Sequence, residues 1–186
     1  NSLFVSLHKF GIDQGGILLS TSFDPHTITA EEIYKTIGNT HKQYTYDKKV
    51  IQEITIHKSR IHVSIIEGLV IASTSRILVE DAIRQYASTE KLLTNTTFQQ
   101  LYNTISDRYD INLLYNINHL AEYTTLLSNN SGTYKELKQF SSWFATDIDL
   151  NRYNITASGF SALNNTVRNY TDIFVEQKTT TPNIAT

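Results

Sequence analysis

The chain has 186 residues, of which 40% are hydrophobic, 11% aromatic and 18% charged, and its formal net charge is −2. This length and apolar content suit an ordinary folded domain and exclude collagen, coiled coil and full disorder. The 16 Lys and Arg residues are spread along the sequence, so no basic patch for nucleic-acid binding is expected.

Polar uncharged side chains make up a large share of the sequence. Asn, Ser, Thr and Gln account for about a third of the residues, whereas charged residues fall below the ~25% that is usual in globular proteins. Such a surface is common in exported and envelope proteins, so we expect a periplasmic or cell-surface location. The sequence opens on an apolar stretch with no charged region or cleavage site, so we expect any signal peptide or membrane anchor to lie outside it. No apolar run approaches the roughly 18 residues of a membrane-spanning helix.

The first quarter of the chain predicts two strands and a short helix. Apolar runs at residues 3–7 and 16–23 are separated by glycines and an aspartate, which is typical of a strand pair. Thr29 and Glu32 have capping-box spacing, because the Thr hydroxyl can accept from the backbone while the Glu side chain reaches back. We therefore expect a helix to begin at this point.

From residue 43 to residue 73 the hydrophobic period falls to two. Ile54 and Ile56 alternate with polar neighbours, and so do Ile61 and Val63. Alternation of this kind predicts an antiparallel meander with one face directed inward.

Two amphipathic helices are expected next. A stripe of apolar residues predicts a helix from about residue 74 to residue 87. The stripe consists of Leu78, Val79, Ala82, Ile83 and Tyr86. A second capping box, Thr97 to Gln100, predicts the start of another helix that buries Phe98 and Leu101.

The last part of the chain predicts strands and helices in alternation. The expected elements are a strand over residues 111–117, a helix over 120–127, a helix that begins at Thr133 and carries Phe144 on its apolar side, and a hairpin of residues 143–151 with 153–160. From residue 171 the apolar density falls, so residues 171–186 are expected to form a linker-like tail.

These elements predict an α+β fold, with a largely antiparallel sheet and several amphipathic helices packed on one face. The expected domain spans residues 1–170. Each half contains strands followed by an amphipathic helix, so two related halves, 1–90 and 91–170, stay open as an alternative arrangement.

One segment partly copies a calcium-binding loop. Asp147, Asp149 and Asn151 have the spacing of the first three ligands. However, Arg152 stands where the turn needs glycine, and Ser158 stands where a bidentate Glu is needed. Strand alternation explains the two carboxylates more simply, as a solvated face.

No motif predicts a catalytic residue, a resident metal or a cofactor. His57 and His62 flank a predicted hairpin turn, but a zinc site would need Glu53 or Glu67 as a third ligand. The sequence contains no cysteine, no nucleophile elbow and no phosphate-binding loop.

The aromatic residues supply a second hypothesis. Tyr44 and Tyr46 lie two apart on a predicted strand and share one face, where they could stack on a sugar or a peptide. Together with His57 and His62 they form the candidate ligand-binding set. Ordinary packing of both tyrosines in the core is the competing interpretation.

Three stretches follow one another in the second part of the chain: residues 69–75 running into the helix 78–83, the strand 111–117, and the hairpin 143–150 with 155–160. Together they resemble a family of exported domains of unknown function in Bacteroidetes envelope proteins, and the resemblance covers about residues 60–182. The resemblance implies a periplasmic or surface location and a longer parent protein. It supplies no functional residue.

We therefore expect a non-catalytic module of an exported cell-envelope protein with an interaction or structural role. Its partner would be an envelope protein or another domain of the same parent chain. A glycan- or peptide-binding module is the alternative. A metal-assisted hydrolase that uses His57, His62 and a carboxylate is the more distant one.

Overall fold

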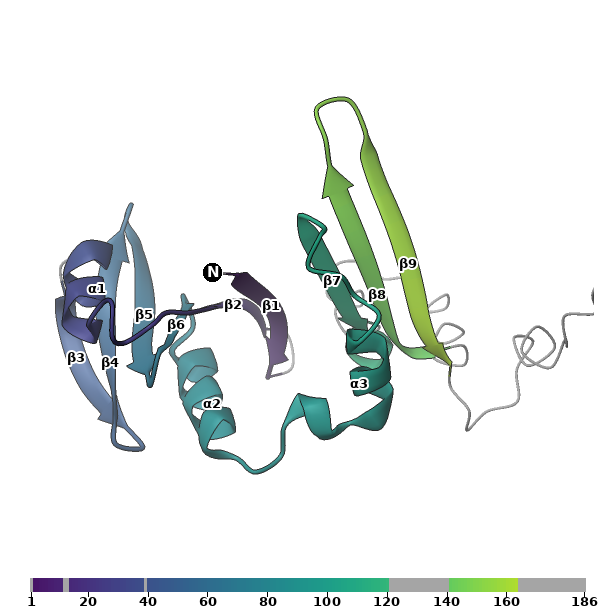
Figure 1. The fold of residues 1–186 in the computed structure, drawn as a ribbon. Helices are drawn as coiled ribbons and strands as arrows, with labels where there is room; N and C mark the ends of the chain where they lie inside the picture. The colour runs from purple at the N-terminus through teal and green to yellow at the C-terminus, as the bar shows by residue number, and fades with distance from the viewer. Residues whose placement is uncertain (1, 12–13, 39, 121–140, 164–186) are drawn as a thin grey trace, which may run out of the picture. The chain divides into compact units, whose positions relative to one another are not determined.

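The computed structural model describes residues 2–11, 14–38, 40–120 and 141–163. The chain divides into two compact units, Asn1–Lys91 and Leu92–Thr186. Each unit contains its own antiparallel sheet, so each is described separately (Figure 1).

The first unit is built on a six-stranded sheet in the order β1-β2-β6-β5-β4-β3, in which all neighbours are antiparallel. Its strands are β1 (Leu3–Phe10), β2 (Gln14–Ser22), β3 (Thr40–Tyr46), β4 (Lys49–Ile56), β5 (Ser59–Ile66) and β6 (Leu69–Ser73). The strands expected at residues 3–7 and 16–23 and the meander from 43 to 73 are thus confirmed. The β1–β2 hairpin joins this meander alongside β6.

Two-residue turns connect the four strands of the meander. The central residues of all three turns have positive φ, from 43° at Asp47 to 86° at Gly68. Such turns match the twist of antiparallel strands. The second turn is His57-Lys58, so His57 lies in the turn itself and does not flank it on a strand as predicted.

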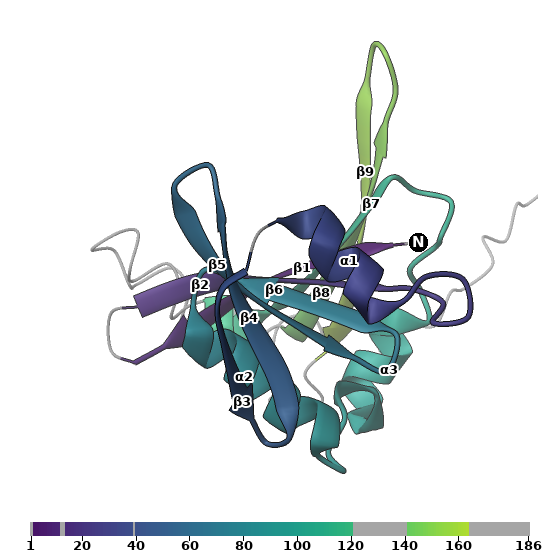
Figure 2. The ribbon, with the colours of Figure 1, turned by 90° about the vertical axis from the view of Figure 1, so that its left-hand side faces the viewer.

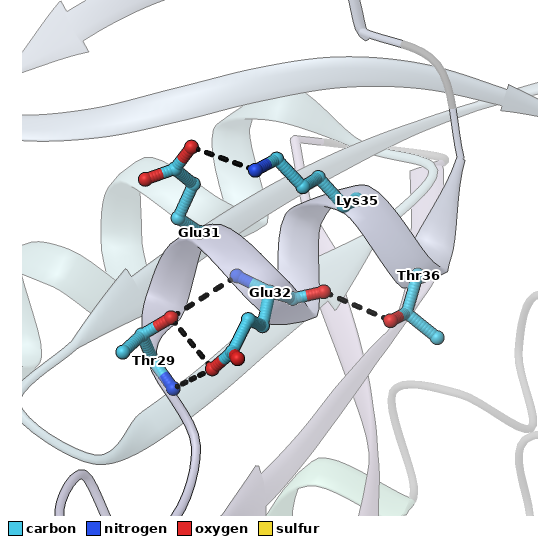
Figure 3. A network of polar contacts seen from close by, with 5 residues as sticks. All are labelled: Thr29, Glu31, Glu32, Lys35 and Thr36. Carbon is cyan, nitrogen blue, oxygen red and sulfur yellow. Dashed lines mark hydrogen bonds and ion pairs between the residues drawn. The ribbon is translucent and has the colours of Figure 1, made fainter.

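Helix α1 (Ala30–Ile37) begins at the predicted capping box (Figure 3). The Glu32 backbone N–H donates to the Thr29 hydroxyl at 3.3 Å, and the Thr29 backbone N–H donates to the Glu32 carboxylate at 2.8 Å. The hydrogen bonds that the Thr29 backbone N–H and the Thr29 hydroxyl donate to the Glu32 carboxylate lower the pKa of Glu32 below its ordinary value. An exposed ion pair of 2.9 Å joins Glu31 to Lys35 one turn later.

Helix α2 (Arg76–Ala87) packs on one face of the sheet and completes its core. The buried cluster consists of Ile51, Ile66, Ile71, Val79 and Ile83. Gly16 on β2 permits the close approach of the helix, because a Cβ there would lie 2.8 Å from Leu78 Cδ1. The predicted stripe is confirmed at its buried positions.

Helix α1 borders the opposite face of the sheet (Figure 2). It shares a shallow cleft of about 570 Å³ with Val50 and Gln52, whose side chains point away from the face of Ile51. The Tyr34 hydroxyl accepts from the backbone N–H of Ile65 at 3.1 Å. This hydrogen bond satisfies the Ile65 N–H, which lies beyond Ser64, the last residue of β5 that pairs with β4.

The second unit contains a three-stranded sheet in the order β7-β8-β9. Its elements are a short 3₁₀ turn (Leu92–Thr94), α3 (Thr96–Tyr102), β7 (Ile111–Asn116), β8 (Ser141–Leu150) and β9 (Ile155–Leu163). Helix α3 lies against β8 and β9, where the rings of Phe98 and Trp143 pack edge to face at a centroid distance of 4.8 Å. The strand near residue 111 and the closing hairpin are confirmed.

Two local predictions in this unit are wrong. The N-cap of α3 is Asn95, whose side chain accepts from the Phe98 N–H at 2.9 Å, whereas Thr97 lies inside the helix. Phe144 lies on β8 and not on a helix. The helices expected over 120–127 and from Thr133 fall mainly on residues 121–140, which lie outside the described residues, as does the tail.

The described elements therefore form an α+β structure with antiparallel sheets and a few helices. The expectation of several helices packed on one face is not confirmed among them. No described helix has the length and apolar character needed to cross a bilayer.

Candidate functional site

The most exposed apolar surface of the first unit lies on β1 and β2. Strand alternation places five aliphatic side chains on the face of the sheet opposite α2. They are Leu3, Val5 and Leu7 of β1, exposed by 64%, 59% and 65%, and Ile17 and Leu19 of β2, exposed by 48% and 39%. Register pairs Val5 with Leu19 and Leu7 with Ile17, so the five side chains form one patch, here called the β1–β2 face.

The outer edge of β1 has no strand neighbour in the described part of the chain. β1 is the terminal strand of its sheet, so its outer N–H and C=O groups face no other described strand (Figure 1). Edge strands are usually protected by charge, proline, a bulge or a cover. β1 has no proline and pairs with β2 without a bulge, and Lys9 near its end is its one Lys, Arg, Asp or Glu.

The opposite edge of the same sheet carries the usual protection. β3 is mostly polar, contains Lys42, and has a register shift between Thr40 and Lys42. The β3 edge therefore carries features that resist strand addition, whereas β1 lacks them and borders no second strand on its outer side among the described residues.

Sequence reasoning did not identify this surface. The apolar run at residues 3–5 predicts a strand, but its edge position depends on the pairing of β2 with β6, which is far along the chain. The one local signal of this surface was the run of three apolar residues Leu3-Phe4-Val5, which breaks the alternation expected of a strand with one solvated face. Phe4, on the other side of β1, is 57% exposed as well.

The structure brings together two of the four predicted ligand-binding residues. The Tyr44 hydroxyl lies 3.3 Å from Nδ1 of His62, and their rings meet edge to face at 6.3 Å. The Arg76 guanidinium lies 4.2 Å above the centre of the Tyr44 ring and covers that side of it. Burial raises the pKa of Tyr44 and lowers the pKa of His62.

Of the other two predicted residues, Tyr46 packs against the same core cluster as Tyr44, whereas His57 lies in a turn. Tyr46 is half-buried against the core under α2. His57 is exposed in its turn. His62 lies farther along the hairpin, opposite Glu53, three residue pairs beyond the Ile56–Ser59 pair that borders the turn. In the described part of the chain, no three His, Cys, Asp or Glu residues come together as a metal site.

Asp147 was predicted to lie on a solvated face, but it is buried. It is only 2% exposed, and its Oδ1 has no hydrogen-bond partner. Its cross-strand neighbour Asn112 also leaves Oδ1 unpaired, although its Nδ2 donates to the Ser106 carbonyl at 3.3 Å. Asp147 and Asp149 border an open cleft of about 440 Å³ that also contains Arg108. The predicted solvation is therefore wrong for Asp147.

Comparison with known proteins gives no relative from which a function could be transferred. No protein family model matches the sequence, and no curated protein and no solved structure is significantly similar to it.

Proposed function

We propose that this chain is a non-catalytic interaction module of an exported cell-envelope protein, and that it binds a protein through the β1 edge and the β1–β2 face. The contrast between the two edges of one sheet carries the proposal. A partner strand hydrogen-bonded to β1 would satisfy its outer backbone groups, and apolar side chains at alternate positions would contact Leu3, Val5 and Leu7.

The apolar surface available is large enough to matter. Complete burial of an aliphatic side chain stabilises by roughly 1.5–3 kcal/mol. Five side chains that are about half exposed can therefore contribute roughly 4–8 kcal/mol, which is comparable to the cost of association at the lower end of its range.

The location is part of the proposal and rests on composition. A polar, weakly charged surface supports a periplasmic or surface-exposed protein that is anchored by a segment outside this chain. The partner would be another envelope protein or another domain of the parent chain. The glycan-binding alternative has less support, because Arg76 covers one face of the Tyr44 ring and Tyr46 packs against the core.

The experiment measures strand addition directly. A labelled peptide with the sequence of residues 3–9, flanked by lysines for solubility, is titrated with the full chain by fluorescence anisotropy. We expect saturable binding, weakened at least about tenfold by Val5→Lys, because a charge on an open edge opposes strand pairing.

Thr45→Lys is the matched control, since it adds the same charge to an exposed position on the protected β3 edge. It should bind the peptide as the unmodified chain does, and a scrambled peptide should bind neither. Equal loss in both variants would overturn the proposal. Turnover of generic ester, glycoside or peptide substrates by the purified chain would also overturn its non-catalytic part.

A further inference from the structure

We infer that the occupant of the β1 edge is β1 of a second copy of this chain, paired antiparallel about a two-fold axis at Val5. The inference rests on the proposed function, because it names the partner for the same edge. It is carried by the exposure, the register and the chemistry of the two edges.

The aliphatic side chains of the β1–β2 face are more exposed on β1 than on β2, and this difference indicates where a partner would bind. Ile17 and Leu19 lie on β2, which has a strand on both sides, and they are less exposed than any of the three aliphatic side chains of β1 on that face. The two strands carry similar side chains on the same face, so the difference lies in the open flank of β1. A neighbouring strand would supply that flank, whereas a partner lying only on the face would leave the backbone groups unpaired.

The sequence of β1 is complementary to itself in one antiparallel register. With Val5 opposite Val5, Leu3 lies opposite Leu7 and Phe4 opposite Ser6. The aliphatic side chains of both copies then share one side of the sheet, whereas a shift by one residue would place them on opposite sides. Lys9 falls outside these pairs, so no like charges oppose each other.

The protected β3 edge explains why assembly would stop at two copies. A two-fold contact uses the same surface of each subunit and closes on itself. The joined sheet would present only its two β3 edges, which carry the polar residues and the register shift described above. An open filament would require β3 to accept a strand.

The test uses the absence of cysteine from the sequence, since an introduced thiol has no competitor. In the proposed register, Val5→Cys places two thiols directly opposite each other across the axis, within reach of a disulfide or a short bis-maleimide. Leu3→Cys is the matched control, because its two thiols would lie four residues, or about 13 Å, apart along the strands. Thr45→Cys on β3 is the control for random collision.

We expect Val5→Cys to give at least about tenfold more cross-linked dimer than either control, since only its thiols satisfy disulfide distances. Sedimentation of the unmodified chain should show a species of twice 21.2 kDa that Val5→Lys converts to monomer. A monomer at all concentrations, or equal cross-linking of Val5→Cys and Leu3→Cys, overturns the inference. If the chain is monomeric but still binds the β1 peptide, only the dimer is wrong. If it does neither, the proposed function is wrong as well.

Discussion

The packing of α2 on the six-stranded sheet can be tested by truncating Val79. This side chain is fully buried in the cluster with Ile71 and Ile83. Val79→Ala removes two carbon atoms, worth roughly 1.6 kcal/mol of transfer free energy. A residual cavity of about 50 Å³ adds about 1.2 kcal/mol, so the free energy of unfolding should fall by about 3 kcal/mol. For a unit of this size we expect the melting temperature to fall by at least about 10 °C.

The matched control is Ile77→Ala on the same helix. Ile77 is larger than Val79 but is 50% exposed, so its truncation should cost less than about 1 kcal/mol. Urea unfolding of the full chain, followed by far-UV circular dichroism, measures both variants. Equal losses would refute the packing of α2 through Val79, because the larger side chain would then contribute as much from the solvent side.

Two further predictions concern a pKa and a helix cap. Burial lowers the pKa of His62 below 6.5, so the unfolded chain takes up this proton first and stability falls as the pH drops through that value. His62→Gln should therefore flatten the dependence of the melting temperature on pH between about 7 and 5, and an unchanged slope would contradict the burial. Asn95→Ala should lower the free energy of unfolding by about 1 kcal/mol, because Asn95 caps α3. Ser75→Ala should change it by less than about 0.5 kcal/mol, because Ser75 makes no side-chain cap at α2, and equal effects in urea unfolding would contradict this difference.

Local chemistry made much of the first unit predictable. The meander follows from alternation and short polar turns, and α1 follows from the spacing of Thr29 and Glu32. The errors arose where two local signals compete. Both Asn95 and Thr97 are good N-cap residues, and the choice depends on which start buries Phe98 against Trp143.

The candidate surfaces were less predictable, because they depend on contacts between distant segments. Alternation cannot show which face of a strand is covered, so Asp147 was expected in water although it is buried. Likewise, no local pattern indicates that β1 is the terminal strand, since this follows from the pairing of β2 with β6. The proximity of Tyr44 and His62 similarly depends on the register across three strands.

The pairing of β2 with β6 has a consequence for how the chain is made. The Ser73 hydroxyl donates to the Ile17 carbonyl at 2.7 Å across 56 residues of sequence, whereas two-residue turns join the strands of the meander. Closing so long a loop carries an entropic cost that the meander avoids, so we expect the β2–β6 pairing to form after the meander. During synthesis, the hairpin of β1 and β2 leaves the ribosome before β6 exists. Until β6 follows, this hairpin lacks its inner neighbour, and its exposed aliphatic side chains are a site where chaperones would bind.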